Sequence, residues 1–164
     1  MRSVVVCMLL LALTAAATDT WAQGRPNLTV EIRVEREVYK ADAQGASQTV
    51  REQVQETRRD DVLVYTLQWH NKGDGVARGA VLSDPIPAGT VLLRGSLEGV
   101  PAQVTYSVDG ENYSKWPQEK VADANGNETW VDVPESAVRH IRWGLAEAVP
   151  PGGIGETSFK VLVQ

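Results

Sequence analysis

Alternation of apolar and polar residues constrains this chain more than any other feature of its sequence. Between Leu28 and Glu35 every second residue is apolar, and the residues between are Thr, Glu or Arg. Successive side chains of an extended chain point to opposite faces, so this period of two predicts a strand with one buried and one solvated face. The pattern recurs from Asp61 to Trp69 and in later runs: Gly79–Ser83, Thr90–Leu93, Val104–Val108, Trp130–Val133, Val138–Leu145 and Thr157–Val163.

Turn-forming residues separate these runs at fairly regular intervals. They are Gly73-Asp74-Gly75, Pro85 to Gly89, Asp109-Gly110, Asn125-Gly126-Asn127 and Pro150 to Gly153. Short strands with such spacing are typical of an all-β sandwich. We therefore predict an immunoglobulin-like antiparallel β-sandwich of seven to nine strands, without a second domain or an internal repeat.

The segment from Lys40 to Asp60 does not fit this pattern clearly. Val50 and Val54 lie four residues apart, which suits one face of a short helix. Thr49, Val50, Val54 and Thr57 would equally suit a strand. An extra hairpin at a sheet edge is the interpretation we favour, with a helix as the alternative.

The N-terminus has the layout of a secretory signal peptide. Arg2 precedes an apolar run from Val4 to Ala17, and small residues follow. The run is shorter than the roughly 20 residues of a membrane-spanning helix. Cleavage after Ala22 is preferred, with Ala15 and Ala17 as another site, so residues 1–22 are the predicted signal and 23–164 the domain. The sequence thus predicts a secreted protein, periplasmic or at the cell surface, with no membrane insertion after cleavage.

Charge and cysteine content exclude several function classes. The formal net charge is −5, and no patch of Lys and Arg stands out. Nucleic-acid binding and adsorption to anionic lipid are therefore not expected. The chain's single cysteine, Cys7, lies inside the predicted signal, so the domain must fold without disulfides.

The densest local signals form two neighbouring motifs, at residues 71–77 and 81–90. The first, Asn71-Lys72-Gly73-Asp74-Gly75, predicts a hairpin turn with Asp74-Gly75 at positive-φ positions. In the second, Asp84-Pro85-Ile86-Pro87-Ala88-Gly89-Thr90, the prolines and the glycine predict a rigid corner after a strand.

These motifs resemble a family of conserved-repeat, immunoglobulin-like bacterial surface domains, known as domain of unknown function eleven. The residues that carry the resemblance are Asp61, Leu63, Tyr65, Leu67, Asn71, Gly73, Asp74, Asp84, Pro85, Pro87, Gly89 and Thr90. It continues through Ser107-Val108-Asp109-Gly110 and Arg142-Trp143 to Phe159-Lys160-Val161. The resemblance implies an exported, non-catalytic module of surface or envelope proteins, where such domains often form tandem arrays. This chain has a single copy, which favours a small subunit or accessory protein.

Residues suited to catalysis or metal binding are few. His70 and His140 are the only histidines and lie within strand patterns, and no Gly-x-Ser-x-Gly motif occurs. We expect no enzymatic activity and no cofactor. Asp123, Asn125 and Asn127 place oxygen ligands at alternate positions, as calcium loops do, but the glycine and glutamate spacing is wrong for an EF-hand. A solvated turn is the favoured interpretation of this loop, and a calcium site the alternative.

Four tryptophans follow the predicted signal. Trp69 and Trp143 lie inside strand patterns and are predicted core residues, whereas Trp116 lies in a polar loop and Trp130 begins a strand. Exposed aromatic side chains can stack on sugars or anchor a protein partner. Trp116, Tyr113 and Trp130 are therefore the candidate partner-binding residues, although packing over the end of the sandwich would also explain them.

Two functional hypotheses follow. In the first, the domain is a structural module that assembles with itself or with another envelope protein by strand pairing, as a fibre subunit would. The alternating N-terminal strand is the candidate strand donor, through Leu28, Val30, Ile32 and Val34. In the second, loops at one end of the sandwich recognise a glycan or a protein partner.

Overall fold

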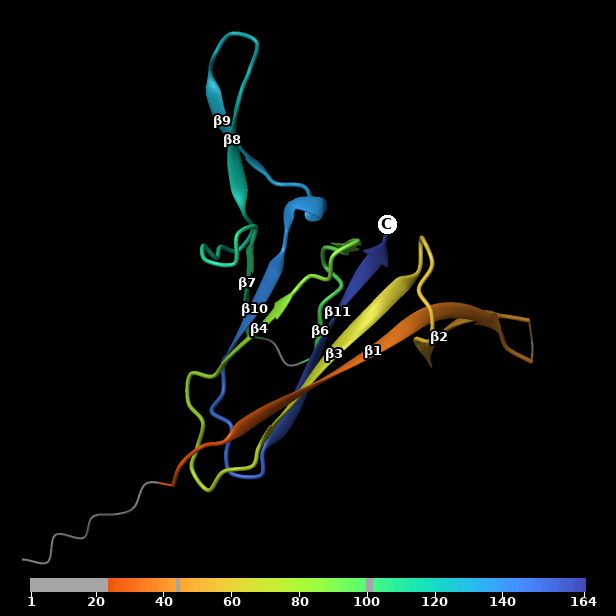
Figure 1. Cartoon of the computed structure of the whole chain (residues 1–164), viewed down its shortest axis with the longest axis vertical. Helices are drawn as coiled ribbons and strands as arrows, with labels where there is room; N and C mark the ends of the chain where they lie inside the picture. Colours follow the sequence, from red (N-terminus) through yellow and green to blue (C-terminus); the bar gives the residue numbers. More distant parts are fainter. Residues whose placement is uncertain (1–23, 44, 100–101) are drawn as a thin grey trace, which may run out of the picture.

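The computed structural model describes residues 24–43, 45–99 and 102–164, so the predicted signal peptide lies outside the described residues. The chain folds into two packed antiparallel sheets and a separate hairpin (Figure 1). The strands are β1 (Leu28–Ala41), β2 (Ser47–Gln53), β3 (Val62–Asn71), β4 (Val81–Pro85), β5 (Thr90–Leu92), β6 (Glu98–Gly99), β7 (Ala102–Ser107), β8 (Gln118–Ala122), β9 (Glu128–Asp132), β10 (His140–Leu145) and β11 (Ile154–Val163). A 3₁₀ turn, η1, covers Glu135–Ala137.

The large sheet has the order β2-β1-β3-β11-β5, and β6 also pairs with β11. β3 and β11 are its centre, since β3 pairs with β1 from Val62 to Asn71 and with β11 from Val62 to His70. The small sheet has the order β4-β10-β7. The predicted all-β sandwich is confirmed. The described residues form eleven strands rather than the predicted seven to nine, because the very short β6 and the separate β8–β9 hairpin add to the strands of the sandwich.

The core lies between the two sheets, as the alternation predicts. Leu67 and Trp69 of β3 and Phe159 of β11 face Ile141 and Trp143 of β10, and all of them are buried. The predicted core positions of Trp69 and Trp143 are therefore confirmed. The Phe159 ring lies 5.3 Å from the ring of Tyr65 and 5.8 Å from that of Trp143, measured between centroids.

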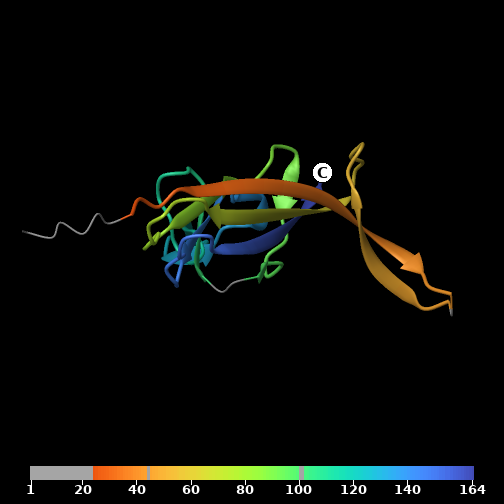
Figure 2. The ribbon, with the colours of Figure 1, turned by 90° about the horizontal axis from the view of Figure 1, so that it is seen from below.

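The segment from 40 to 60 contains the favoured hairpin rather than a helix. β1 continues to Ala41 and pairs with β2 from Glu35↔Gln53 to Ala41↔Ser47. This β1–β2 hairpin extends away from the sandwich (Figure 2). Most of its outer residues are exposed, and Tyr39 is 77% exposed. The weak periodicity of this segment therefore reflects a hairpin with little core to cover.

The predicted hairpin turn at Asp74-Gly75 is wrong. β3 belongs to the large sheet and β4 to the small sheet, so the connection crosses from one sheet to the other. Neither Asp74 nor Gly75 has a positive φ. The glycines serve close approach instead, because a Cβ on Gly75 would collide with the carbonyl of Gly24, and one on Gly73 with that of Arg25. Gly89, in the second motif, does have a positive φ, of 78°.

Candidate association surfaces

The first part of β1 forms an edge of the large sheet to which no strand of the described residues binds. β3 pairs with β1 from Leu28 onward, but on the other side β2 pairs only from Glu35. Within the described residues, no strand pairs with the outer edge of residues 28–33. The Asn27 carbonyl accepts a hydrogen bond from Lys72, so odd-numbered residues of β1 direct their backbone toward β3. Leu28, Val30 and Ile32 consequently direct their N–H and C=O groups outward, where a further strand would bind.

The side chains along this free edge are apolar on the core side. Leu28 and Val34 pack against the core, whereas Val30 is 42% exposed and Ile32 51% exposed. Prolines and inward-pointing charges commonly prevent an edge strand from pairing with another chain. Residues 28–32 contain neither. By contrast, β4 ends at Pro85 and β5 has three residues. The free β1 edge is therefore better suited to strand addition than the edges of β4 and β5.

Asn71 fixes the beginning of β1. Its side chain is fully buried, its Nδ2 donates to the carbonyls of Gly75 (2.8 Å) and Val149 (2.9 Å), and its Oδ1 accepts from the N–H groups of Asn27 (3.0 Å) and Gly73 (3.1 Å). Next to it, Asp74 accepts a hydrogen bond from the Arg25 N–H at 2.6 Å. The first motif of the sequence thus holds the segment before β1 against the end of β3.

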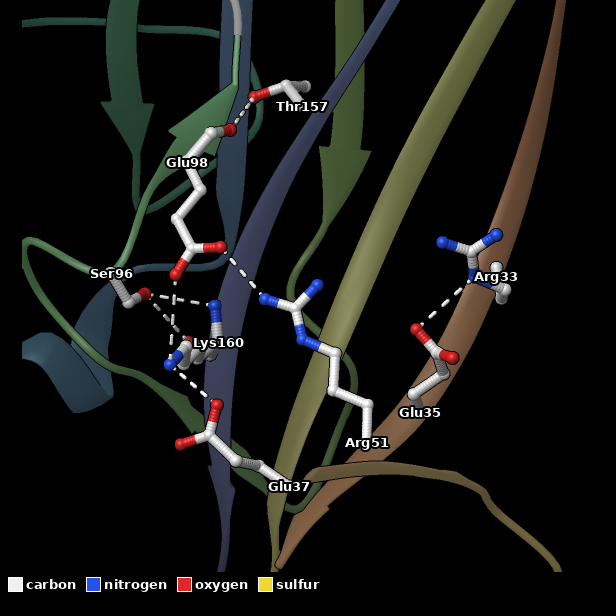
Figure 3. Close-up of polar contacts among 8 residues, drawn as sticks. All are labelled: Arg33, Glu35, Glu37, Arg51, Ser96, Glu98, Thr157 and Lys160. Carbon is white, nitrogen blue, oxygen red and sulfur yellow. Dashed lines mark hydrogen bonds and ion pairs between the residues drawn. The ribbon is translucent and has the colours of Figure 1, made fainter. Parts of the chain in front are cut away.

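Ion pairs on the outer face of the large sheet hold the other half of β1 (Figure 3). Lys160 Nζ of β11 lies 2.6 Å from Glu37 Oε2 of β1 and 3.9 Å from Glu98 Oε1 of β6. Arg51 of β2 lies 2.8 Å from the other Glu98 oxygen. The Lys160 amide also donates to Ser96 Oγ at 2.9 Å. No local sequence pattern indicates this cluster, because its members come from strands whose order in the sheet the sequence does not give.

The β8–β9 hairpin, here called the arm, projects from the end of the sandwich (Figure 1). Every residue of its two strands is exposed, so both faces lie in solvent. Trp130 is 60% exposed, and the Lys120 ammonium lies 5.6 Å from its ring centroid while pairing with Glu128 at 2.7 Å. An isolated two-stranded hairpin is only marginally stable in water. The arm is therefore the second surface at which a partner could add stability.

A cluster at the root of the arm holds it to the sandwich. Trp116 is buried between the Tyr106 ring, 4.7 Å away, and the Arg94 guanidinium, 4.0 Å away. Its Nε1 donates to the carbonyl of Val133 at 3.0 Å. Arg94 and Gln118 both bind the Asp132 carboxylate, at 2.9 and 3.0 Å, and they hold its pKa below the ordinary value, the Gln118 bond contributing most. These groups line an open depression of about 680 Å³.

The three candidate partner-binding aromatics differ in availability. Trp116 is buried and contacts both the Tyr106 ring and the Arg94 guanidinium of the root cluster. Tyr113 is half-buried, and its ring is covered by the Arg142 guanidinium at 3.4 Å. Trp130 is mostly exposed on the arm. Of the three, Trp130 is the residue that a partner could reach without a rearrangement.

The loop at the tip of the arm is a hydrogen-bonded turn around Asp123. Its Oδ1 accepts from the N–H groups of Asn125 (2.8 Å) and Asn127 (2.9 Å), and its Oδ2 accepts from Asn127 Nδ2 (3.0 Å). These bonds, the Asn127 side chain first, hold the pKa of the Asp123 carboxyl below its ordinary value. In the described part of the chain, no group of three or more His, Cys, Asp or Glu side chains is placed to hold a metal ion.

Asp84 is a buried acid on the inner side of β4. Its side chain is 7% exposed, and burial raises the pKa of its carboxyl. Burial and the nearby Asp84 charge both raise the pKa of Tyr65 across the core. The two histidines contribute to no comparable cluster, since His70 lies on β3 and His140 on β10 beside Gly110. Burial of the Asp84 carboxyl therefore affects stability.

Comparison of the chain with protein-family models, curated proteins and solved structures returns no match. Among the helices of the described residues, none is long and apolar enough to cross a membrane.

Proposed function

We propose that this chain is an exported structural module of the bacterial cell envelope or surface, which associates with a neighbouring subunit by strand pairing at the free β1 edge. The signal-like N-terminus and the family resemblance of its two motifs support export and a surface role. The observation that carries the proposal is the unpaired edge of residues 28–33, with Val30 and Ile32 exposed on its core side.

Addition of a strand to this edge accounts for the geometry better than donation of β1 to another subunit. Donation would require β1 to leave β3, with which it pairs over ten positions. It would also break the hydrogen bond from the Asn27 N–H to Asn71 Oδ1 and the Glu37–Lys160 ion pair. Edge pairing keeps these interactions and satisfies backbone groups that otherwise face solvent. Leu28, Val30, Ile32 and Val34 then act as the accepting edge.

The test is the assembly state of the exported chain. Light scattering and negative-stain microscopy across a concentration series, together with sizing of its complexes in envelope extracts, would measure association. We expect Ile32→Lys to remove association, because an inward charge at an edge opposes strand pairing. Val81→Lys is the matched control, since Val81 is similarly exposed, at 57%, on β4. Association of Ile32→Lys at the level of the parent would overturn the proposal.

The arm supports a second function, recognition of a glycan or a protein partner. The specific observation is Trp130, which is 60% exposed on a hairpin whose strand residues are all exposed. Aromatic faces of this kind stack on sugar rings. Glycan-array and pull-down binding by the parent, lost in Trp130→Ala, would support this function. Binding that survives the substitution would exclude the arm as its site.

A further inference from the structure

The free β1 edge is long enough and apolar enough to bind another copy of itself. Two copies related by a two-fold axis perpendicular to the sheet would pair antiparallel, with the core faces of both sheets on the same side. Residues that face the core must then lie opposite residues that face the core, so even-numbered residues of β1 pair with even-numbered ones. In the same arrangement, the outward N–H and C=O groups of Leu28, Val30 and Ile32 face the N–H and C=O groups of even-numbered residues in the second copy.

Only a few registers satisfy this condition, and most of them are unfavourable. Centring on Glu31 places the Glu31 carboxylates of the two copies directly opposite each other, which is destabilising. Centring on Ile32 brings the second copy's β1 opposite Glu35, a place that Gln53 of β2 already occupies. Centring on Thr29 places Ile32 opposite Pro26, which has no N–H to donate.

We propose that the partner at the free edge is a second copy of this chain, paired antiparallel about Val30; this inference rests on the function proposed above. In this register Val30 faces its own equivalent, and Leu28 faces Ile32 in both directions. Each of these pairs exchanges two main-chain hydrogen bonds. On the outer face Thr29 lies opposite Glu31, so no like charges are directly opposed. From Leu28 to Ile32, the sequence of one strand therefore supplies both halves of an apolar ladder, which ends where Val34 would face Pro26.

Single cysteines measure the centre of the pairing directly. In a chain whose only cysteine is replaced, Cys7→Ser, we compare oxidative cross-linking of Val30→Cys, Glu31→Cys and Ile32→Cys. In the proposed register the two Val30 Cα atoms lie about 5.5 Å apart, within the range that a disulfide spans. The two Ile32 residues are offset by four positions, about 13 Å along the strands. We expect Val30→Cys to form dimers at least about tenfold faster than the other two variants.

Each outcome of this experiment bears on the proposal. Faster cross-linking of Glu31→Cys or Ile32→Cys would overturn the register, and equal rates for Val30→Cys and an exposed control, Val81→Cys, would overturn the pairing. A second measurement uses Thr29→Cys mixed with Glu31→Cys, which should cross-link as a pair and not singly. If none of these variants forms homodimers while Ile32→Lys still loses its complexes in envelope extracts, the partner is another protein and only this inference fails.

Discussion

At the scale of single residues, Asn71 is the polar group on which the N-terminal part of the fold depends. All four hydrogen-bonding positions of its buried amide are used, and they connect the segment before β1, the turn after β3 and the loop at Val149. Asn71→Ala removes four hydrogen bonds to backbone groups, two of them buried and two part-buried, and a lost hydrogen bond costs roughly 1 kcal/mol. We expect the free energy of unfolding to fall by about 3 kcal/mol or more in urea titrations.

The matched control for this substitution is Asn125→Ala, in the exposed tip of the arm. Its side chain is in solvent, so the free energy of unfolding should change by less than about 0.5 kcal/mol. A change below about 1 kcal/mol for Asn71→Ala would contradict the role that the hydrogen bonds assign to Asn71.

Asp84 makes stability depend on pH in a direction set by its burial. Its carboxyl has an ordinary pKa of 3.8, and in the folded chain that pKa is raised. As pH rises through 3.8 the unfolded chain loses the proton first, so the folded state becomes less stable until its own raised pKa is passed. We therefore expect Asp84→Asn to be more stable than the parent at pH 7, and this difference to shrink toward zero below pH 3.8.

Unfolding in urea at several pH values measures this difference. Glu147→Gln is the control, because it removes one carboxylate from an exposed loop instead of from the core. A stability difference between Asp84→Asn and the parent that is constant from acid to neutral pH would show that charge burial is not its cause.

At the scale of strands and hairpins, the two tryptophans of the arm region differ in burial and therefore in their contribution to stability. Trp116 is buried under Arg94 and Tyr106 at the root, whereas Trp130 lies on an exposed strand. Trp116→Ala should lower the free energy of unfolding by about 3–5 kcal/mol, as truncation of a buried Trp does. Trp130→Ala should lower it by less than about 1 kcal/mol, the strength of an exposed cation–π contact. Equal losses would mean that the arm is packed in solution.

The sequence predicts strands well and their surroundings poorly. The period of two in residues 28–35 and 61–69 correctly indicates β1 and β3, because alternation depends only on the extended backbone. Burial depends on what packs against each face, so the pattern alone did not show that Trp130 would be exposed. The glycines after Asn71 wrongly predict a hairpin, although the chain there crosses from one sheet to the other. Glycine occurs both in turns with positive φ and where two backbone segments approach closely, and the sequence does not distinguish the two.

At the scale of the whole molecule, the candidate association edge follows from topology rather than from any motif. Residues 28–34 are visibly strand-like in the sequence, but their exposure arises because β2 pairs only with the second half of β1. The position of the turn between β1 and β2 sets how far β2 extends along β1. That turn lies in segment 40–60, whose sequence pattern is weak. The Lys160–Glu37 pair likewise joins the first and last strands, which no local pattern relates. Contacts between strands far apart in the sequence therefore determine both where the free edge of β1 lies and which ion pair stabilises β1.

Net charge opposes association of two identical copies of the chain. Each chain carries −5, and in pairing about Val30 no residue from 28 to 32 lies opposite a residue of unlike charge, while the two Glu31 carboxylates become diagonal neighbours. Added salt should therefore strengthen the dimer, since the Debye length falls from roughly 30 Å at 0.01 M to roughly 3 Å at 1 M. Sedimentation of the chain across that range should show a rising dimer fraction. Pairing about Ile32 would instead place Glu31 opposite Arg33 twice, and screening would weaken it. A dimer that dissociates as salt is added would therefore point to that register and require β2 to move away from Glu35.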